Sequence, residues 1–404
     1  MAGPPEGGRF DRDVVVIGGC GHVGLPLAIA FADRGARVGI CDVSEAAVST
    51  VNTGTLPFDE PGAAGALKRV VADGRLTACA DPSIIASAEH VIVVIGTPVD
   101  EHLDPDRQAV PNALGDCVPY LRDGQLLVLR STVFPGVTAL VEKMVAGLGV
   151  QIEVAFCPER IAEGKAMTEL FELPQIVSAR SPHGLERAAR LFGLLTDSIV
   201  ELSPEEAELA KLFTNVWRYI KFATANQFYM MANDRGLDFE RIRQGLSRDY
   251  PRAADMPGAG FAAGPCLFKD TMQLAAFNNS QFALGHTAMT INEGLPDYVV
   301  HRLEQRFDLG SMTVGILGMA FKAGSDDTRS SLSYKLKRIL AFKAHEVLCA
   351  DPYVTADPGL LPQEDVVARS DLLVIAAPHP QYRGLVTDKP VADIWNVLGR
   401  GVRV

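Results

Sequence analysis

A buried strand followed at once by a glycine-rich turn constrains this chain more than any other feature. Residues 14–17 form a continuous β-branched run, and Gly19, Gly21 and Gly24 follow it in the spacing G-x-G-x-x-G. A helix-like stretch occupies residues 25–34. Strand, glycine turn and helix in this order allow a tight turn, a close approach to a pyrophosphate and close helix–strand packing. The sequence therefore predicts a dinucleotide site at this turn.

An acidic residue closes the next predicted strand. Asp42 follows the apolar run 37–41, in the position where a carboxylate accepts hydrogen bonds from ribose hydroxyls. A negative charge there repels the 2′-phosphate of NADP, so the sequence favours NAD as the cofactor. A glycine-rich turn without a ligand is the competing interpretation.

Short apolar runs recur at helix-length intervals through both ends of the chain. After the first two strands, further strands are expected near 91–95, 126–130 and 152–156, which gives the rhythm of a parallel, doubly wound sheet to about residue 200. The pattern restarts from Met312, with runs at 314–318, 346–349 and 372–375. A second α/β domain is expected there, without a glycine fingerprint of its own.

A long helix is predicted between these two regions. Ser203, Pro204 and Glu206 form a capping box, and no further proline or glycine occurs before Gly236. A helix of about 30 residues would be on the order of 45 Å long. Its apolar residues at helical spacing predict a core-facing stripe: Leu209, Leu212, Phe213, Val216 and Ile220. The length also suggests a spine between two lobes and a dimer contact.

Composition narrows the function classes. The net charge of -11 disfavours a nucleic-acid partner, because such proteins carry basic patches that neutralise phosphates. Residues 1–10 do not resemble a signal peptide, and no apolar run is long enough for a membrane span. The seven cysteines are scattered, with no C-x-x-C pair, which disfavours a disulfide framework or a zinc cluster. We expect a cytoplasmic protein without a membrane partner or a bound metal.

One cysteine has unusual neighbours. Cys266 follows a loop rich in glycine and alanine and precedes Lys269 and Asp270. If a helix begins there, Cys266 and Asp270 share one face, and the helix N-terminus stabilises a thiolate. A buried structural cysteine is the default alternative. The pattern favours a reactive thiol.

Two further pairs of polar residues leave their roles open. Lys211 and Asn215 lie four residues apart on the predicted long helix, where they are either solvated or placed to stabilise an oxyanion. Glu159 and Glu163 follow a predicted strand and are either solvated loop acids or ligand contacts. The turns at 96–98 and 131–136 also follow strands, at the edge where open α/β sheets bind ligands.

Taken together, these residues resemble the UDP-glucose/UDP-N-acetylhexosamine/GDP-mannose 6-dehydrogenase family over nearly the whole chain. Seven segments carry the resemblance: GCGHVGLPLA (19–28), GTP (96–98), STVFPG (131–136), PERIAEG (158–164), ELAKLFTN (208–215), GPCLFKD (264–270) and GMAFKAGSDDTR (318–329).

The resemblance implies a four-electron oxidation of the C6 hydroxyl of a nucleotide-sugar to a uronate. Cys266 would capture the C6 aldehyde as a thiohemiacetal, a second NAD would accept the second hydride, and water would hydrolyse the thioester. Lys211 and Asn215 would hold the oxyanion, and Asp270 would act with water as a base or as the lysine's partner. Glu159 and Thr132 would position the hydrolytic water.

The resemblance also implies ligand contacts. The NAD site would comprise Gly19, Gly21, His22, Val23, Gly24, Asp42, Thr97, Thr132, Lys269 and Arg329. The sugar nucleotide would contact Glu159, Glu163, Lys211, Asn215, Gly264 and Lys322.

The family architecture implies two Rossmann-like, doubly wound parallel-sheet domains joined by a long central helix in an all-α middle domain. The expected segments are an NAD-binding domain (1–200), a central helical dimerisation domain that carries Lys211, Asn215 and Cys266 (201–297), and a C-terminal UDP-sugar-binding domain (298–404). A homodimer is expected.

The sequence departs from the family pattern beside the thiol. Ala262 and Ala263 replace a glycine pair, and Gln227 follows Asn226 where the family usually has Glu. The substrate signals also conflict. Arg218 and the PGAG segment at 257–260 resemble the N-acetylhexosamine branch, whereas the Lys-Asp pair after the cysteine resembles the glucose and mannose branches. We favour a UDP-N-acetylhexosamine, with UDP-glucose or GDP-mannose as the alternative.

Two other function classes share parts of this pattern. A single-step NAD hydroxy-acid dehydrogenase would have a first Rossmann domain and a lysine–asparagine pair but would need no thiol. A non-enzymatic NAD-binding protein would result if Ala262 and Ala263 had closed the site.

Overall fold

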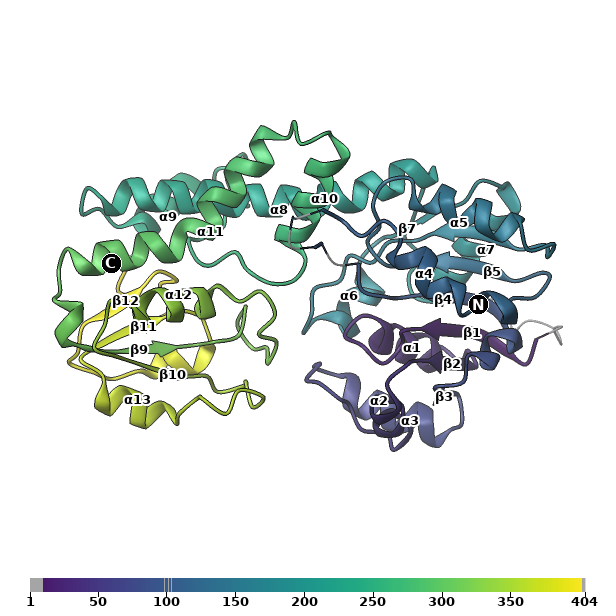
Figure 1. The fold of residues 1–404 in the computed structure, drawn as a ribbon, viewed down its shortest axis with the longest axis horizontal. Helices are drawn as coiled ribbons and strands as arrows, with labels where there is room; N and C mark the ends of the chain where they lie inside the picture. The colour runs from purple at the N-terminus through teal and green to yellow at the C-terminus, as the bar shows by residue number, and fades with distance from the viewer. Residues whose placement is uncertain (1–9, 98, 101, 103, 402–403) are drawn as a thin grey trace. The chain divides into compact units, whose positions relative to one another are not determined.

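The computed structural model describes residues 10–97, 99–100, 102, 104–401 and 404. The chain divides into two compact units, residues 1–213 (unit 1) and 214–404 (unit 2). The boundary falls inside one long helix, α8 (Pro204–Asn233). Each unit is built around its own parallel sheet (Figure 1).

Unit 1 contains a six-stranded parallel sheet in the order β3-β2-β1-β4-β5-β6. Its strands are β1 (Arg12–Ile17), β2 (Val38–Cys41), β3 (Leu76–Cys79), β4 (Ala88–Val93), β5 (Leu126–Leu129) and β6 (Glu153–Phe156). This order is that of a dinucleotide-binding Rossmann sheet, whose ligands bind at the carboxyl ends of the strands. The predicted doubly wound fold is confirmed.

Helices cover both faces of this sheet because alternate residues of each strand point to opposite faces. Val14 and Val16 of β1 join one apolar cluster, and Val15 and Ile17 join another. The helices of unit 1 are α1 (Gly24–Asp33), α2 (Glu45–Asn52), α3 (Ala63–Ala72), α4 (Ala109–Gly115), α5 (Val137–Ala146), α6 (Ala166–Glu172) and α7 (Pro182–Phe192). A separate parallel pair follows, β7 (Gln175–Ser178) with β8 (Ile199–Leu202).

Unit 2 begins with helices and ends with a four-stranded parallel sheet in the order β10-β9-β11-β12. Its helices are the rest of α8, α9 (Phe239–Ser247), α10 (Leu267–Phe277), α11 (Ala283–Glu304), α12 (Leu332–Ala341) and α13 (Gln363–Arg369). Its strands are β9 (Thr313–Leu317), β10 (Glu346–Ala350), β11 (Leu372–Ile375) and β12 (Val391–Asp393). One apolar cluster contains residues of α8, α11 and β9, so these helices and this sheet share a core.

The predicted long helix is confirmed in its start and length. The Ser203 backbone N–H donates to Glu206 Oε2 (2.8 Å), and Glu206 N–H donates to Ser203 Oγ (3.4 Å), which is the reciprocal capping box. Leu212 and Val216 of the predicted stripe are buried, but Phe213 is 53% exposed. Among the described residues, no helix is long and apolar enough to cross a bilayer.

Sequence analysis did not predict four of the strands, and their form explains why. β3 and β12 lie at sheet edges and span only four and three residues, while β7 and β8 form a separate pair. In β3 buried and exposed residues alternate, so the strand lacks the continuous apolar run that marks a central parallel strand.

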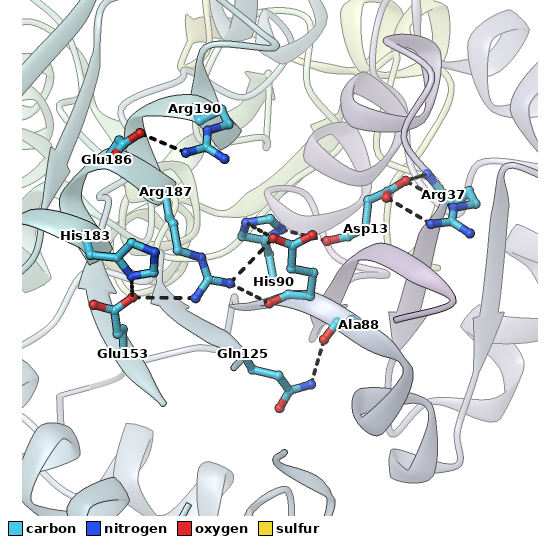
Figure 2. A network of polar contacts seen from close by, with 11 residues as sticks. Asp13, Arg37, Ala88, His90, Gln125, Glu153, His183, Glu186, Arg187 and Arg190 are labelled. Carbon is cyan, nitrogen blue, oxygen red and sulfur yellow. Dashed lines mark hydrogen bonds and ion pairs between the residues drawn. The ribbon is translucent and has the colours of Figure 1, made fainter. Parts of the chain in front are cut away.

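A polar network occupies the amino-terminal edge of the unit 1 sheet (Figure 2). His90 of β4 donates through Nδ1 to the Asp13 carbonyl oxygen at 2.9 Å. The Arg187 guanidinium lies 3.7 Å from Glu89 and 3.6 Å from Glu153. Burial lowers the pKa of His90, although the hydrogen bond to Asp13 and the charge of Glu89 act in the opposite direction. His90 therefore resists protonation in the folded protein.

We predict that acid destabilises unit 1 through His90. Because its pKa is lower when folded, the unfolded chain binds the proton more readily. This contribution to the free energy of unfolding is complete above about pH 6.5 and is lost as the pH falls from there toward the folded-state pKa. Urea unfolding between about pH 5 and 8 measures it. His90→Asn should flatten the slope, the exposed-site variant His345→Asn should not, and an unchanged slope in His90→Asn would refute the assignment.

Candidate active site

The three glycines of the dinucleotide turn have different surroundings. A Cβ at Gly19 would lie 2.9 Å from the Val16 carbonyl oxygen, and one at Gly24 would lie 2.7 Å from the Gly18 carbonyl oxygen. A Cβ at Gly21 would meet no atom within 4 Å. Gly19 and Gly24 are therefore required for packing, whereas Gly21 faces the open side where a pyrophosphate would approach. The turn fits a dinucleotide.

Asp42 lies beside this turn at the carboxyl end of β2. Its Oδ2 accepts the Cys20 N–H at 2.9 Å, and its Oδ1 accepts the Ser44 N–H at 3.0 Å. His22 packs its ring against Phe58, with centroids 4.0 Å apart. Val23 immediately precedes α1. The two hydrogen bonds orient the Asp42 carboxylate beside the turn, and its recognition of a ribose stays a prediction.

The loops after β4 and β5 are joined by side-chain hydrogen bonds. Thr97 Oγ1 donates to the Thr132 carbonyl oxygen at 2.6 Å, and Ser131 Oγ accepts the Ile95 N–H at 2.7 Å. Thr132 is half-buried. Pro98 of the GTP segment lies outside the described residues. The structure thus brings Thr97 and Thr132 together at the carboxyl edge of the sheet.

Glu159 is a buried ion-pair partner, so it is not a solvated loop acid. Its carboxylate pairs with Arg130, whose side chain is fully buried. The other oxygen accepts the N–H groups of Arg160 (2.6 Å) and Ile161 (3.0 Å). Arg130 also donates to the Cys157 carbonyl oxygen at 2.9 Å. Glu159 therefore holds the loop that it begins.

Two further carboxylates fix the rest of this loop. Glu169 accepts the Ala162 N–H at 2.6 Å. The buried Glu60 accepts the N–H groups of Gly164 and Ala166, each at 2.8 Å. Because these backbone donors are satisfied, the loop is held in one conformation, with the half-buried Glu163 on it.

Glu208, in the second turn of α8, fixes a neighbouring loop of unit 1. Buried Glu208 accepts the N–H groups of Gly136 (2.7 Å) and Thr138 (2.9 Å) and the Thr138 hydroxyl (2.6 Å). A carboxylate at the first turn of α5 satisfies donors that have no partner within the helix. The segment 131–136 that carries Thr132 is thereby anchored.

In unit 2, Cys266 immediately precedes α10, which meets the condition under which sequence analysis placed Cys266 and Asp270 on one helix face. The Asp270 N–H donates to the Cys266 carbonyl oxygen at 2.9 Å, which closes the first helical turn. Asp270 is 1% exposed and accepts Asn215 Nδ2 at 2.5 Å, while Lys269 Nζ lies 3.0 Å from its other oxygen. The structure therefore joins Asn215, Lys269 and Asp270 one turn from the thiol.

Lys211 lies one turn before Asn215 on α8. It is 9% exposed, which rules out a solvated surface lysine. Burial of a charged ammonium group is unfavourable unless polar partners compensate for the lost water. Buried charged side chains are therefore common in active sites, where they stabilise charge that develops during the reaction. Burial therefore favours the functional alternative for this residue.

The exposure of Cys266 distinguishes it from the other six cysteines, all of which lie within the described residues. Cys266 is exposed, whereas Cys79 is half-buried and the others are buried. Burial raises the pKa of Cys20, Cys41 and Cys157 to about 12. Because the thiolate is the nucleophile, Cys266 is the thiol best placed to react.

The turn ahead of Cys266 packs against the segment 318–330. Gly264 has a φ of +100°, and a Cβ there would lie 2.6 Å from the Phe321 ring. Its N–H donates to the Ser330 carbonyl oxygen at 3.3 Å. The same segment carries Lys322, 5.4 Å from the centre of the Phe321 ring, and Arg329, paired with Asp327 at 2.6 Å. Gly264, Lys322 and Arg329 are thus brought to one region of unit 2.

The loop between α9 and α10 is also fixed by a residue that sequence analysis treated only as part of a departure. Buried Asn226 donates to the Gly260 carbonyl oxygen (3.0 Å) and accepts the Gly260 N–H (2.9 Å). Ala262 is buried in a small apolar cluster with Tyr219 and Leu267. The methyl group at 262 is accommodated by packing.

Sequence analysis missed the residues that hold these loops. They are Glu60, Arg130, Glu208 and Asn226. Arg130 could have been recognised from the sequence, because a charged residue directly after the apolar run 126–129 is expected to be buried and to need a charged partner. The others have partners distant in sequence, which no local pattern reveals.

Comparison with known proteins gives matches along most of the chain. Residues 12–195, 205–294 and 315–400 match the NAD binding, central and UDP binding domains of the UDP-glucose/GDP-mannose dehydrogenase family. A UDP-N-acetyl-D-mannosamine dehydrogenase from Pyrococcus horikoshii is 29% identical over 96% of this chain and 99% of its own length.

Two further relatives extend the comparison. An NDP-N-acetyl-D-galactosaminuronic acid dehydrogenase from Ralstonia nicotianae is 28% identical over 94% of both chains. The structure of a UDP-glucose dehydrogenase from Pyrobaculum islandicum superposes with a TM-score of 0.91 at 28% identity, over 100% of this chain and 99% of the other.

The two glycine environments generate opposite mutational predictions. Gly21→Val places a side chain in open space, so the variant should keep its melting temperature but lose NAD binding by at least about tenfold. Gly24→Val clashes with backbone and should lower the melting temperature by several degrees. Thermal unfolding and NAD titration measure both effects. Equal destabilisation by the two substitutions would contradict the assigned roles.

Proposed function

Because the chain belongs to the UDP-glucose/GDP-mannose dehydrogenase family of NAD-dependent oxidoreductases, we propose that it oxidises the C6 hydroxyl of a UDP-sugar to a carboxylate through a covalent intermediate on Cys266. The observation that carries the mechanism is the exposed Cys266 at the start of α10, one turn from the buried Asp270–Asn215 pair. The match to a UDP binding domain supports the nucleotide.

Two NAD molecules, held one after the other at the glycine turn, would each accept one hydride, the first from the alcohol and the second from the thiohemiacetal. The Cys266 thiolate adds to the C6 aldehyde and forms a thiohemiacetal, which keeps the aldehyde on the protein. Oxidation of that adduct gives a thioester, and water releases the uronate and the free thiol. Two hydrides and one added water account for the conversion of an alcohol to an acid.

The polar residues near the thiol have complementary proposed roles. The Asn215 amide gives one N–H to Asp270, which orients its second N–H toward a developing oxyanion. Buried Lys211 is the proposed cationic partner of the same oxygen. Asp270, held by Lys269, acts with water as a base or as a partner of the lysine.

The remaining assignments are proposals on the same basis. Glu159 and Thr132 position the hydrolytic water, Lys269 and Arg329 contact the cofactor, and Glu163, Gly264 and Lys322 contact the sugar nucleotide. The ion pair with Arg130 gives Glu159 a fixed orientation, which a water-positioning group requires.

We propose a UDP-N-acetylhexosamine as the substrate. The names of the Pyrococcus and Ralstonia relatives support an N-acetylated sugar, as do Arg218 and the PGAG segment. The similarity to a UDP-glucose dehydrogenase keeps UDP-glucose as the alternative. Initial rates with UDP-GlcNAc, UDP-ManNAc, UDP-glucose and GDP-mannose decide between them, and turnover of only the last two would refute the proposal.

Replacement of the thiol tests the mechanism. The wild-type protein should form about two NADH per sugar, and Cys266→Ser should form no net acid and at most one NADH per site. Cys117→Ser is the matched control, because a serine hydroxyl can keep the hydrogen bond that Cys117 donates to the Ala113 carbonyl oxygen. A simple hydroxy-acid dehydrogenase would instead retain turnover in Cys266→Ser and form one NADH.

We also propose that the protein is a cytoplasmic homodimer. Large apolar side chains on one face of α8 are exposed, with Trp217 at 58%, Phe228 at 46% and Met231 at 52%. Exposed apolar patches of this kind mark protein contacts. All seven cysteines are free, which supports a reducing compartment.

The dimer proposal predicts the effect of a charge in this patch. Trp217→Glu should convert the dimer to a monomer in sedimentation velocity, because the interface would bury an unpaired charge. Phe342→Glu, at a residue that is 91% exposed after α12, should leave the sedimentation coefficient unchanged. A wild-type protein that sediments as a monomer at micromolar concentration would refute the proposal.

A further inference from the structure

A buried polar cluster lies at the carboxyl edge of the unit 2 sheet. Asp351 follows β10, and His379 follows β11; the Asp351 carboxylate and His379 are both fully buried. His379 Nε2 lies 3.0 Å from Asp351 Oδ2, and His379 Nδ1 accepts the Gly324 N–H at 3.1 Å. A carboxylate accepts only, so Nε2 carries the proton and donates. The histidine thus bridges the aspartate and the segment 318–330.

Asp351 itself binds the start of that segment. Its Oδ2 also accepts the N–H groups of Met319 (2.6 Å) and Ala320 (2.9 Å). Its Oδ1 accepts those of Tyr353 (2.8 Å) and Val354 (3.1 Å). Burial alone would raise the pKa of Asp351, but the hydrogen bonds from His379 and the backbone hold it below its ordinary value. Five donors thus favour the ionised form of this carboxylate.

Asp351 occupies the same place in unit 2 that Asp42 occupies in unit 1, but it accepts more hydrogen bonds. In each unit an aspartate after the second strand of a βαβ pair accepts backbone N–H groups from the turn after the first strand. Asp42 accepts two backbone N–H groups. Asp351 already accepts five hydrogen bonds from the protein, so its carboxylate has no acceptor position left for a ribose hydroxyl. Its role is therefore to hold the protein's own backbone.

Asp351 and His379 hold the segment 318–330, and the turn at Gly264, ahead of Cys266, packs against the same segment. Gly264 donates to Ser330 and lies against the Phe321 ring, and Lys322 lies between these contacts in sequence. A displacement of residues 318–330 would therefore move both the proposed nucleotide contact and the turn ahead of Cys266.

We propose that Asp351 and His379 are positioning residues that fix the segment 318–330 for the UDP moiety and for the Cys266 turn. The UDP part of this inference rests on the proposed function. Neither residue touches substrate; both act through the backbone of Met319, Ala320 and Gly324.

Three substitutions of His379 separate its two hydrogen bonds. His379→Asn keeps an acceptor at the Nδ1 position for Gly324, His379→Gln keeps a donor at the Nε2 position for Asp351, and His379→Leu keeps neither. His345→Leu, at an exposed histidine of the same unit, is the matched control. Each full-length variant is compared with the wild type in its melting temperature before other measurements.

Two readouts are combined on these proteins. Hydrogen exchange of residues 318–330 and 264–266 measures the hold on the segment and needs no ligand. Calorimetric titration with UDP, together with KM for the UDP-sugar, KM for NAD and kcat, measures the consequence for binding.

In His379→Leu we expect exchange in both segments to be about tenfold faster and UDP affinity and the KM for the UDP-sugar to worsen by about five- to tenfold, with the KM for NAD within about twofold. His379→Asn should recover most of this loss and His379→Gln less, because Gly324 belongs to the segment being held. A general packing defect would make the three variants alike.

Unchanged exchange and UDP affinity in His379→Leu would overturn the inference, as would equal losses in all three variants. If His379→Leu does not fold, the contrast between His379→Asn and His379→Gln decides the question. If the wild type binds no UDP while exchange still responds to His379, the proposed function fails and the positioning role stands.

Discussion

A carboxylate buried without partners would be protonated or would unfold the protein, and Asp270 meets this constraint at the centre of the candidate site. Asn215 of α8 donates a hydrogen bond to one carboxylate oxygen, and Lys269 of α10 forms an ion pair with the other. Breaking such a buried pair costs on the order of 3–5 kcal/mol, because the remaining charge is uncompensated. The requirement to pair Asp270 therefore fixes α10 against α8, and Cys266 lies one turn away on the same helix.

The same physics orders the loops of unit 1. Glu60, Glu159 and Glu208 each accept two backbone N–H groups, and Glu169 accepts one, from segments that follow strands or begin helices. A loop at the carboxyl edge of a sheet cannot pair its donors within a ladder, and a charged acceptor forms stronger hydrogen bonds than a neutral one. The loops at the carboxyl edge of the unit 1 sheet therefore contain two kinds of acidic residue: those that accept backbone hydrogen bonds and those proposed to contact ligands. The sequence does not distinguish them, whereas the structure shows which acids bind the backbone.

Sequence analysis predicted the features that depend on residues close together in the sequence. The strand and glycine turn, the capping box at Ser203 and the 30-residue α8 all follow from neighbouring residues, and the structure confirms them. The contact between Asn215 and Asp270 joins residues 55 positions apart, and the bond between Glu60 and Ala166 spans 106. Spacing alone could not distinguish a solvated Lys211 from a buried one, and the structure shows that it is buried.

The packing of Gly264 against residues 321 and 330 has a consequence for the order of synthesis. Domains fold as the chain emerges, N-terminal first, so the cofactor turn of unit 1 can form before the thiol turn has its partners. Ser330 is made 66 residues after Gly264, and the histidine that braces its segment follows 55 residues after Gly324. The surroundings of Cys266 are therefore completed late in synthesis, when the NAD-binding unit can already have folded.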